Sequence, residues 1–256
     1  MLLAIDIGNT NIVFGCFDGE KILFRERAAT SQRSTPLEFA SVIRTALDLH
    51  GVAASSISGA IISSVVPTVT NTMKMAVEKL ADVRVMVVGP GIKTGLSILI
   101  DNPAQLGSDL VVGAVASMNE YTLPQIVIDL GTATTFSVIN EKRDFLGVII
   151  LTGMAVSADA LTNKTAQLPK IAFEAPKKVI GTNTVDSMKS GLMFGTASMI
   201  DGMIQRIEEE LGTHCTIIAT GGLAGTVTPL CKHDIILDDD LLLKGLKIIY
   251  NKNNKA

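Results

Sequence analysis

The same short phrase occurs twice in the chain, as AIDIGNTN at residues 4–11 and as VIDLGTAT at residues 127–134. In each copy an apolar run ends in aspartate, which is followed by glycine and by small hydroxyl or amide residues. Each copy predicts a buried strand that delivers a carboxylate to a tight turn. Glycine lets a phosphate approach backbone N–H groups, and the carboxylate can hold a hard cation beside it. One copy in each half predicts a duplicated fold with a nucleotide between the halves.

The bulk composition is that of a globular protein. The chain has 256 residues, of which 47% are hydrophobic and 18% are charged. This length allows one large domain or two small ones, and the repeated phrase favours two. The net charge of −3, the absence of Trp and the presence of only two Tyr argue against nucleic acid as the main partner.

The cysteines and the N-terminus indicate a cytoplasmic protein. Cys16, Cys215 and Cys231 are odd in number and lack CxxC spacing, so we interpret them as small core residues in a reducing compartment. Asp6 interrupts the first apolar run, which argues against a signal peptide. No apolar stretch approaches the roughly 20 residues that a membrane span needs, so no membrane association is expected.

Hydrophobic periodicity and turn residues predict a similar layout in the two halves, which meet near residue 118. The first half is predicted to contain strands at 2–6, 11–17, 22–27, 58–66 and 83–88 and helices from Pro36 to Gly51 and at 69–80. The second is predicted to contain strands at 126–129, 134–140, 145–150, 216–219 and 235–237 and helices at 154–161, 184–211 and 241–250. Three strands followed by alternating helices and strands, twice over, predict a mixed α/β fold.

Several common catalytic motifs are missing from the sequence. There is no G-x-x-x-x-G-K-[ST], no H-E-x-x-H and no G-x-S-x-G. The three histidines, His50, His214 and His233, are scattered, which argues against a histidine-based metal site or triad.

Two further segments could serve a nucleotide site. The stretch ATGGLA at residues 219–224 predicts a strand that runs into a double glycine, where a flat nucleobase can lie close to the backbone. Asp109, near the start of an apolar helix, is a candidate to orient an acceptor hydroxyl and take its proton. The alternative is that Ser108 and Asp109 only cap that helix.

A series of motifs identifies a family resemblance along nearly the whole chain. They are DIGNTN at 6–11, SSVVP at 63–67, VGPGIKTG at 88–95, DNP at 101–103, GSD at 107–109, DLGTATT at 129–135, TAQLP at 165–169, GTNT at 181–184 and ATGGL at 219–223. On these motifs the chain resembles the type III pantothenate kinases of the acetate and sugar kinase, Hsp70 and actin superfamily.

The resemblance implies a fold and an activity. The fold would be two RNase H-like (actin/Hsp70-like ATPase) domains, at 1–118 and 119–256, around an interdomain nucleotide cleft, with the last helix free to pack back on the first domain. The activity would be transfer of the ATP γ-phosphate to the primary hydroxyl of pantothenate, the first step of coenzyme A biosynthesis. Magnesium, a monovalent cation (potassium or ammonium) and a homodimer that completes the acceptor site would be required.

The resemblance also implies roles for individual residues. The phosphates of ATP would contact Asp6, Ile7, Gly8, Asn9, Thr10, Asn11, Ile12 and Val13. ATP would also contact Thr132, and its base would lie near Gly221 and Gly222. The metal residues would be Asp129 for the monovalent cation and Asp6 for magnesium. Pantothenate would contact Ile100, Gly107, Ser108, Asp109, Leu110 and Thr184, with Asp109 as proton acceptor.

The departures from the family pattern cluster in the acceptor pocket. Leu110 stands where the family has an arginine that meets the pantothenate carboxylate, and Ile100 stands where it has a tyrosine. Loss of that arginine removes a charge-assisted hydrogen bond of roughly 1.5–3 kcal/mol. Three outcomes follow as alternatives: weaker use of pantothenate, another small alcohol as acceptor, or a nucleotide-binding regulator that acts through a protein partner. Lys93 and Lys164 are candidates to replace the lost charge; the alternative is that both are ordinary surface lysines.

Overall fold

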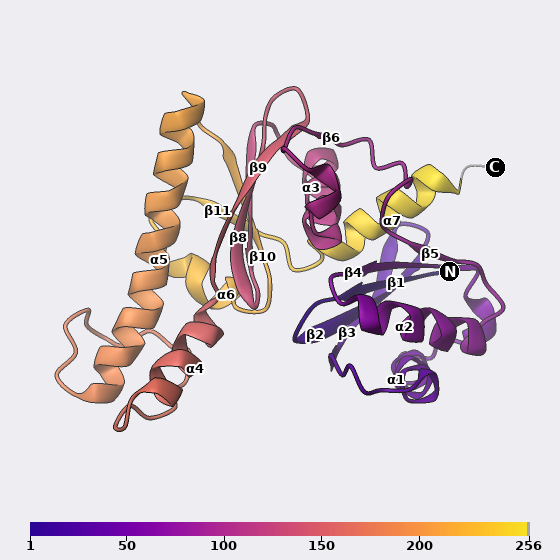
Figure 1. The fold of residues 1–256 in the computed structure, drawn as a ribbon, viewed down its shortest axis with the longest axis horizontal. Coiled ribbons are helices and arrows are strands. Elements are labelled where there is room, and N and C mark those ends of the chain that lie inside the picture. The colour runs from indigo at the N-terminus through magenta and orange to yellow at the C-terminus, as the bar shows by residue number, and fades with distance from the viewer. Residues whose placement is uncertain (255–256) are drawn as a thin grey trace. The chain divides into compact units, whose positions relative to one another are not determined.

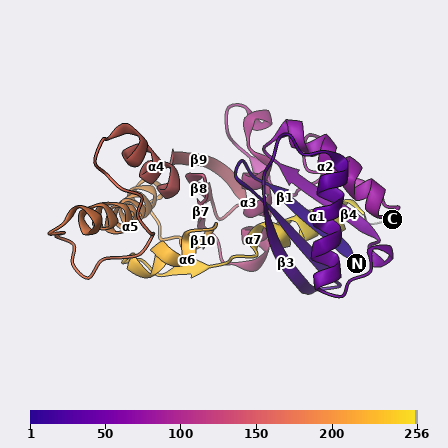
Figure 2. The ribbon, with the colours of Figure 1, turned by 90° about the horizontal axis from the view of Figure 1, so that it is seen from below.

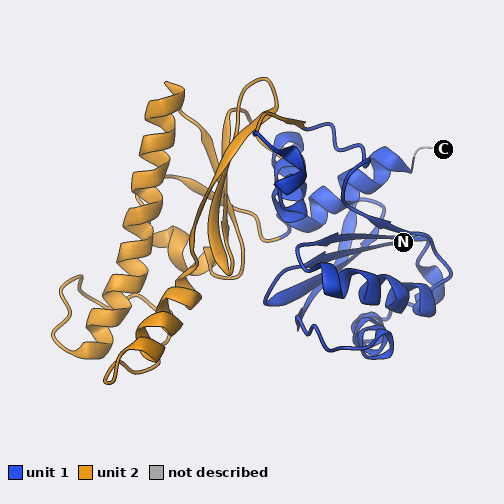
Figure 3. Ribbon diagram, in the orientation of Figure 1, with its two compact units in different colours: residues 1–96, 101–119, 240–256 blue, residues 97–100, 120–239 orange. Residues whose placement is uncertain are grey.

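A computed structural model describes residues 1–254 as two compact units. Unit 1 contains residues 1–96, 101–119 and the chain from residue 240 onward, and unit 2 contains residues 97–100 and 120–239 (Figure 3). The domain limits at residue 118 and the nucleotide cleft stay predictions.

The sheet of unit 1 is mixed. It has the strand order β3-β2-β1-β4-β5, in which β1, β2 and β3 are antiparallel neighbours and β4 and β5 run parallel to β1. The strands are β1 Leu2–Ile7, β2 Asn11–Asp18, β3 Lys21–Ala29, β4 Gly59–Ser64 and β5 Val85–Val87. The strands predicted at 11–17 and 22–27 form a hairpin, in which β2 pairs with β3 across Asp18 and Lys21.

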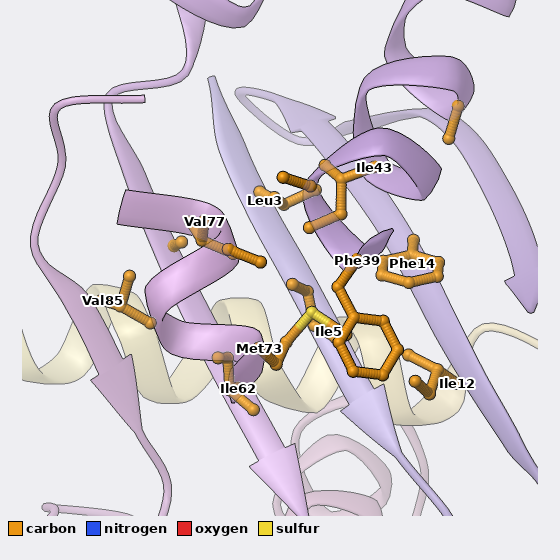
Figure 4. Packing of buried hydrophobic residues seen from close by; sticks show 14 of the residues in the cluster. Leu3, Ile5, Ile12, Phe14, Phe39, Ile43, Ile62, Met73, Val77 and Val85 are labelled. Atoms are coloured by element: carbon orange, nitrogen blue, oxygen red, sulfur yellow. The ribbon is translucent and has the colours of Figure 1, made fainter. Parts of the chain in front are cut away.

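Two helices, α1 (Pro36–Leu49) and α2 (Pro67–Leu80), cover one face of this sheet (Figures 1 and 2). Thr35 caps α1 through a capping box with Glu38. Figure 4 shows Phe39 of α1 and Met73 of α2 packed over Ile5 of β1. Because side chains alternate along a strand, Leu3, Ile5 and Ile7 share this face and Asp6 points to the other one.

The other face of the sheet packs against α7 (Leu241–Asn253), which in turn contacts α3 (Ser108–Glu120). A Cβ at Gly15 of β2 would come within 2.6 Å of Leu243, and one at Gly113 of α3 would come within 3.4 Å of Leu242. Asp6 therefore lies on the face of the sheet that these helices occupy.

The sheet of unit 2 repeats this arrangement. Its order is β11-β10-β7-β8-β9-β6, with β7, β8 and β9 antiparallel and β10 parallel to β7. The strands are β6 Ser97–Ile98, β7 Gln125–Leu130, β8 Ala133–Ile139, β9 Asp144–Thr152, β10 Thr216–Thr220 and β11 Ile235–Leu237. Both copies of the repeated phrase thus form the first strand of a three-stranded antiparallel unit.

The helices of unit 2 are α4 (Met154–Lys164), α5 (Thr184–Leu211) and the short α6 (Ala224–Val227). Both ribbon views show α4 and α5 side by side, and the two helices are in contact (Figures 1 and 2). Ile200 and Ile204 of α5 share a core with Ile128 of β7 and Phe136 of β8. Three short 3-10 turns complete the described chain, at Ala54–Ser56, Pro103–Gln105 and Thr228–Leu230.

The predicted mixed α/β class is confirmed by these two mixed sheets. The pattern missed β6, a two-residue strand, and ended α4 three residues before Lys164. Cys16 lies in the core of unit 1, which confirms its interpretation as a core residue, whereas Cys215 and Cys231 are partly buried and pack against the core of unit 2. Among the described residues, no helix combines the length and apolar character that crossing a bilayer requires.

Candidate functional site

The turn after β1 has the predicted form. The N–H of Gly8 donates to the carbonyl of Asn11 at 2.9 Å, and the Thr30 hydroxyl donates to the Gly8 carbonyl at 2.7 Å. Asn9, Thr10 and Asn11 are exposed at its tip, whereas Ile7 and Ile12 are buried. The tip of the turn is therefore exposed while the residues at its two ends are buried, an arrangement that suits a phosphate-binding turn.

Asp6 lies at the carboxyl end of β1 and is only 7% exposed. It is in register with Ser63 of the parallel strand β4, which is fully buried. The carboxyl ends of parallel neighbours share one edge of the sheet, so Asp6 and Ser63 are adjacent on one face at that edge. The carboxylate is thus placed beneath the turn of residues 8–11.

The first residue of α3 is attached to the same edge. The Ser108 hydroxyl lies 3.0 Å from the hydroxyl of Ser63 and 3.0 Å from both the N–H and the carbonyl of Ser64. The alternative that Ser108 serves as a helix cap is wrong for its side chain: α3 begins at Ser108 itself, and the hydroxyl bonds to β4.

Asp109 follows in the same turn of α3. Its Oδ1 accepts a hydrogen bond from the N–H of Leu110 at 2.8 Å, a bond within the first turn of the helix of the kind that the capping alternative expects of Asp109. Burial raises the pKa of Asp109, and the hydrogen bond from Leu110 opposes part of that rise. Gly107 leaves room for the carboxylate, since a Cβ there would overlap Oδ1. Asp109 therefore binds a proton at a higher pH than an ordinary aspartate does, because its pKa is raised.

Unit 2 carries the second aspartate turn. Asp129 of β7 is in register with Thr220 of the parallel strand β10, and the N–H of Gly131 donates to the Ala133 carbonyl at 3.0 Å. Gly221 follows β10 with φ +99°, and a Cβ there would lie 2.7 Å from backbone atoms of Leu130 and would overlap the Asp129 carboxylate. Only glycine fits this position, because it packs against the backbone of Leu130. The approach of a nucleobase to the double glycine stays a prediction.

The backbone at Gly153 packs against the turn that follows β7. Its N–H donates to the Thr132 carbonyl at 3.1 Å, and a Cβ there would overlap the carbonyls of Gly131 and Thr132. Thr132 is exposed at the tip of the turn, and Gly222 is exposed beside Gly221.

The side chain opposite Asp129 indicates whether a cation fits beside this carboxylate. Thr135 of β8 lies directly opposite Asp129, and its Oγ1 is buried with no hydrogen-bond partner within residues 1–254. A buried hydroxyl without a partner needs an explanation, and a bound ion or water is one. The described residues hold no group of three or more His, Cys, Asp or Glu that could bind a metal, so a cation at Asp129 would be completed by hydroxyl or carbonyl oxygens. Asp129 and Thr135 fit such an ion.

The remaining predicted residues lie in unit 2. Thr184 is exposed in the first turn of α5, where Asn183 caps the helix. It lines a groove between α4 and α5 with apolar walls that include Leu161 and Met188. Ile100 is half-buried just after β6.

The structure thus groups the predicted residues by unit. Unit 1 holds residues 6–13 and 107–110, and unit 2 holds Ile100, Asp129, Thr132, Thr184, Gly221 and Gly222. Sequence reasoning missed Ser63, Ser64 and Thr135 as members of these sites. Their hydroxyls become visible only once strand register places them beside Asp6 and Asp129.

Comparison with known sequences gives a match along most of the chain. The sequence model of a family described as type III pantothenate kinase matches residues 2–206. A protein of Halalkalibacterium halodurans named type III pantothenate kinase is 42% identical over 99% of this chain and 100% of its own length. A protein of the same name from Syntrophobacter fumaroxidans is 41% identical over 100% of this chain and 99% of its own.

Comparison with solved structures gives the same fold over the full chain. A protein of Campylobacter jejuni described as a putative Baf family transcriptional activator aligns with a TM-score of 0.61 and 18% identity, covering 99% of this chain and 100% of its own. Component A of (R)-2-hydroxyglutaryl-CoA dehydratase from Acidaminococcus fermentans aligns with a TM-score of 0.59 and 16% identity, covering 99% of both chains. At these identities the likeness shows the fold alone.

Proposed function

Because the chain belongs to the type III pantothenate kinase family, we propose that it transfers the γ-phosphate of ATP to the primary hydroxyl of pantothenate, the first step of coenzyme A biosynthesis. The observation that carries this proposal within unit 1 is the pairing of an aspartate turn after β1 with Asp109 at the start of α3. Both are attached to the carboxyl edge of one sheet, through β1 and through the Ser108 bonds to β4.

We expect ATP to bind by its phosphates at the turn of residues 6–13 and at Thr132, with its base near Gly221 and Gly222. The exposed residues at the tip of each turn (residues 9–11 and Thr132) and the exposed Gly222 support this placement. When bound, magnesium would neutralise part of the phosphate charge, and we expect the Asp6 carboxylate to face it. A monovalent cation, potassium or ammonium, would be held by Asp129 with the hydroxyl of Thr135.

Asp109 is the proposed proton acceptor. As the acceptor hydroxyl oxygen forms its bond to the γ-phosphorus, its proton passes to the Asp109 carboxylate. The bond from the γ-phosphorus to the bridging oxygen breaks, and ADP leaves with that electron pair. Partial burial keeps bulk water away from the carboxylate and raises its pKa, which makes it a better base than an exposed aspartate.

Apolar side chains at two of the predicted acceptor-contact positions favour one alternative substrate class. Leu110 and Ile100 are both half-buried, and neither can pair with a carboxylate. A small primary alcohol without the pantothenate carboxylate is therefore the second candidate acceptor. The same enzyme chemistry applies to both.

We also propose a homodimer in the cytoplasm. Val179 and Ile180 directly precede Gly181, a residue of the groove that Thr184 lines; they are 65% and 82% exposed, and a second copy of the chain would cover them. The cysteines are free thiols, in keeping with a reducing compartment.

The pH dependence of turnover tests the role of Asp109. The value of kcat/KM for the acceptor should fall as the pH drops through the raised pKa of Asp109, because the protonated carboxyl cannot take the hydroxyl proton. The midpoint of this acid limb should lie above the ordinary aspartate pKa of about 3.9. Asp109→Asn should lower kcat by about 10²–10⁴-fold and leave ATP binding unchanged.

Asp82→Asn is the matched control, because Asp82 is an exposed acid of the same unit outside the site. It should leave both kcat and the acid limb as in the wild type. Wild-type turnover by Asp109→Asn would contradict the assigned role.

The identity of the acceptor is tested by restoring a cation at position 110. Leu110→Arg should raise kcat/KM for pantothenate over that for its neutral analogue pantothenol by about 10–100-fold, the effect of one charge-assisted hydrogen bond. The ratio is the measured quantity because it cancels general effects on folding and on ATP binding.

Leu110→Met supplies a similar length without charge and should leave this ratio unchanged. An unchanged ratio for Leu110→Arg would show that the acceptor carboxylate does not face residue 110.

The proposed homodimer is tested by the mass of the protein in solution. Light scattering should return twice the chain mass of 27.0 kDa at micromolar concentration. A mass of one chain across that range would rule the dimer out.

A further inference from the structure

Ser108 lies beside the proposed base and has hydrogen bonds that the reaction scheme above does not use. We propose that Ser108 is a positioning residue: its hydroxyl fixes the first turn of α3 to the end of β4 and thereby places the Asp109 carboxylate. The inference rests on the proposed function, because Asp109 is the base only if the chain is a kinase.

The hydrogen bonds of Ser108 use its full capacity. A hydroxyl has one donor and two acceptor sites. The Ser64 N–H donates to the Ser108 hydroxyl at 3.0 Å, the Ser64 carbonyl accepts from it at 3.0 Å, and the Ser63 hydroxyl occupies the third position at 3.0 Å. These bonds join segments 44 and 45 residues apart in the sequence. Such saturation holds the side chain in one orientation.

The partners of Ser108 are themselves fixed. Ser63 is fully buried in β4, in register with Asp6 of β1. The Ser64 hydroxyl accepts from Thr70 at 2.8 Å and from the Val66 N–H at 3.1 Å, which ties the end of β4 to the first turn of α2. We name Ser63, Ser64, Thr70 and Ser108 the hydroxyl cluster. It connects the start of α3 to two other elements of unit 1.

The position of the carboxylate depends on this attachment. Asp109 is the next residue after Ser108, and its Oδ1 takes a hydrogen bond from Leu110 in the same turn. The carboxylate therefore moves with the turn, and the turn is held through Ser108. A shift of about 1 Å at a reacting group can lower the rate about 10²-fold.

A purely structural role for Ser108 makes a different prediction. In that case removal of the hydroxyl lowers the melting temperature and leaves the kinetic constants of the folded protein unchanged. If Ser108 positions Asp109, its removal loosens the turn and lets water reach the carboxylate, so the burial that raises the pKa of Asp109 is reduced. The acid limb then moves to lower pH.

The test compares Ser108→Ala with Ser108→Thr, which keeps the hydroxyl. Ser108→Ala should lower kcat by about 10–100-fold with KM for ATP within about twofold of the wild type, and should move the acid limb to lower pH. Ser108→Thr should restore most of kcat and the wild-type acid limb. If Ser108→Ala fails to fold, Ser63→Ala replaces it, because this variant removes one partner of Ser108 and leaves the bonds to Ser64. It should lower kcat and shift the acid limb in the same direction by a smaller amount.

Ser117→Ala is the matched control. Ser117 is a fully buried hydroxyl of the same helix, and its Oγ donates to the Ala114 carbonyl within α3 at 3.1 Å. This variant should reduce the melting temperature without changing kcat or the acid limb. A folded Ser108→Ala protein with wild-type kcat and acid limb would overturn the inference. A wild-type protein that releases no ADP with any acceptor would instead refute the proposed function.

Discussion

Parallel pairing at the carboxyl ends of strands is the constraint on which both candidate sites depend. In unit 1, β1 lies beside β4 so that Asp6 is in register with Ser63, and in unit 2, β7 lies beside β10 so that Asp129 is in register with Thr220. Alternation of side chains then sends the apolar residues of β1 into the core under α1 and α2 and leaves Asp6 on the opposite face. A slip of one residue in either pairing would bury the carboxylate in the apolar core.

The two units use the same strand arrangement but complete the turn with different chemistry. Unit 1 surrounds its aspartate edge with hydroxyls, through Ser63 and Ser108. Unit 2 brings backbone close instead, with Gly153 against Thr132 and Gly221 against Leu130. The first arrangement suits the placement of a catalytic base, and the second fixes the turn around Asp129 by close backbone packing. The duplicated phrase therefore marks a shared framework rather than two equal sites.

Much of this fold could be predicted because its signals are local. The repeated apolar run before Asp-x-Gly located β1 and β7, and the helical spacing at 184–211 matched α5 to the residue. The start of α1 was marked by Pro36, a residue favoured in the first turn of a helix. β6 was missed because a strand of two residues has no periodicity to detect and forms only by pairing with β9.

The candidate sites could be predicted only in part, because their remaining contacts join distant segments. The sequence left Ser108 open as a substrate contact or a helix cap, because its hydrogen-bond partners in β4 precede it by 44 and 45 residues. The buried hydroxyl of Thr135 becomes informative only when antiparallel register places it across from Asp129. Asp109 could be singled out as an acid near a helix start, but the rise of its pKa follows from burial that only the folded chain provides.

The central claim is that the aspartate turns bind a nucleotide, and calorimetric titration with ATP and magnesium tests it most directly. Gly221→Ala places a methyl group against Leu130 and Asp129, whereas Gly212→Ala, at φ +69° with open space around it, adds only backbone strain. The wild type and Gly212→Ala should bind ATP equally well, and folded Gly221→Ala should bind at least about tenfold more weakly, a change of about 1.4 kcal/mol. Absence of heat with the wild type, or equal affinity in folded Gly221→Ala, would contradict the account.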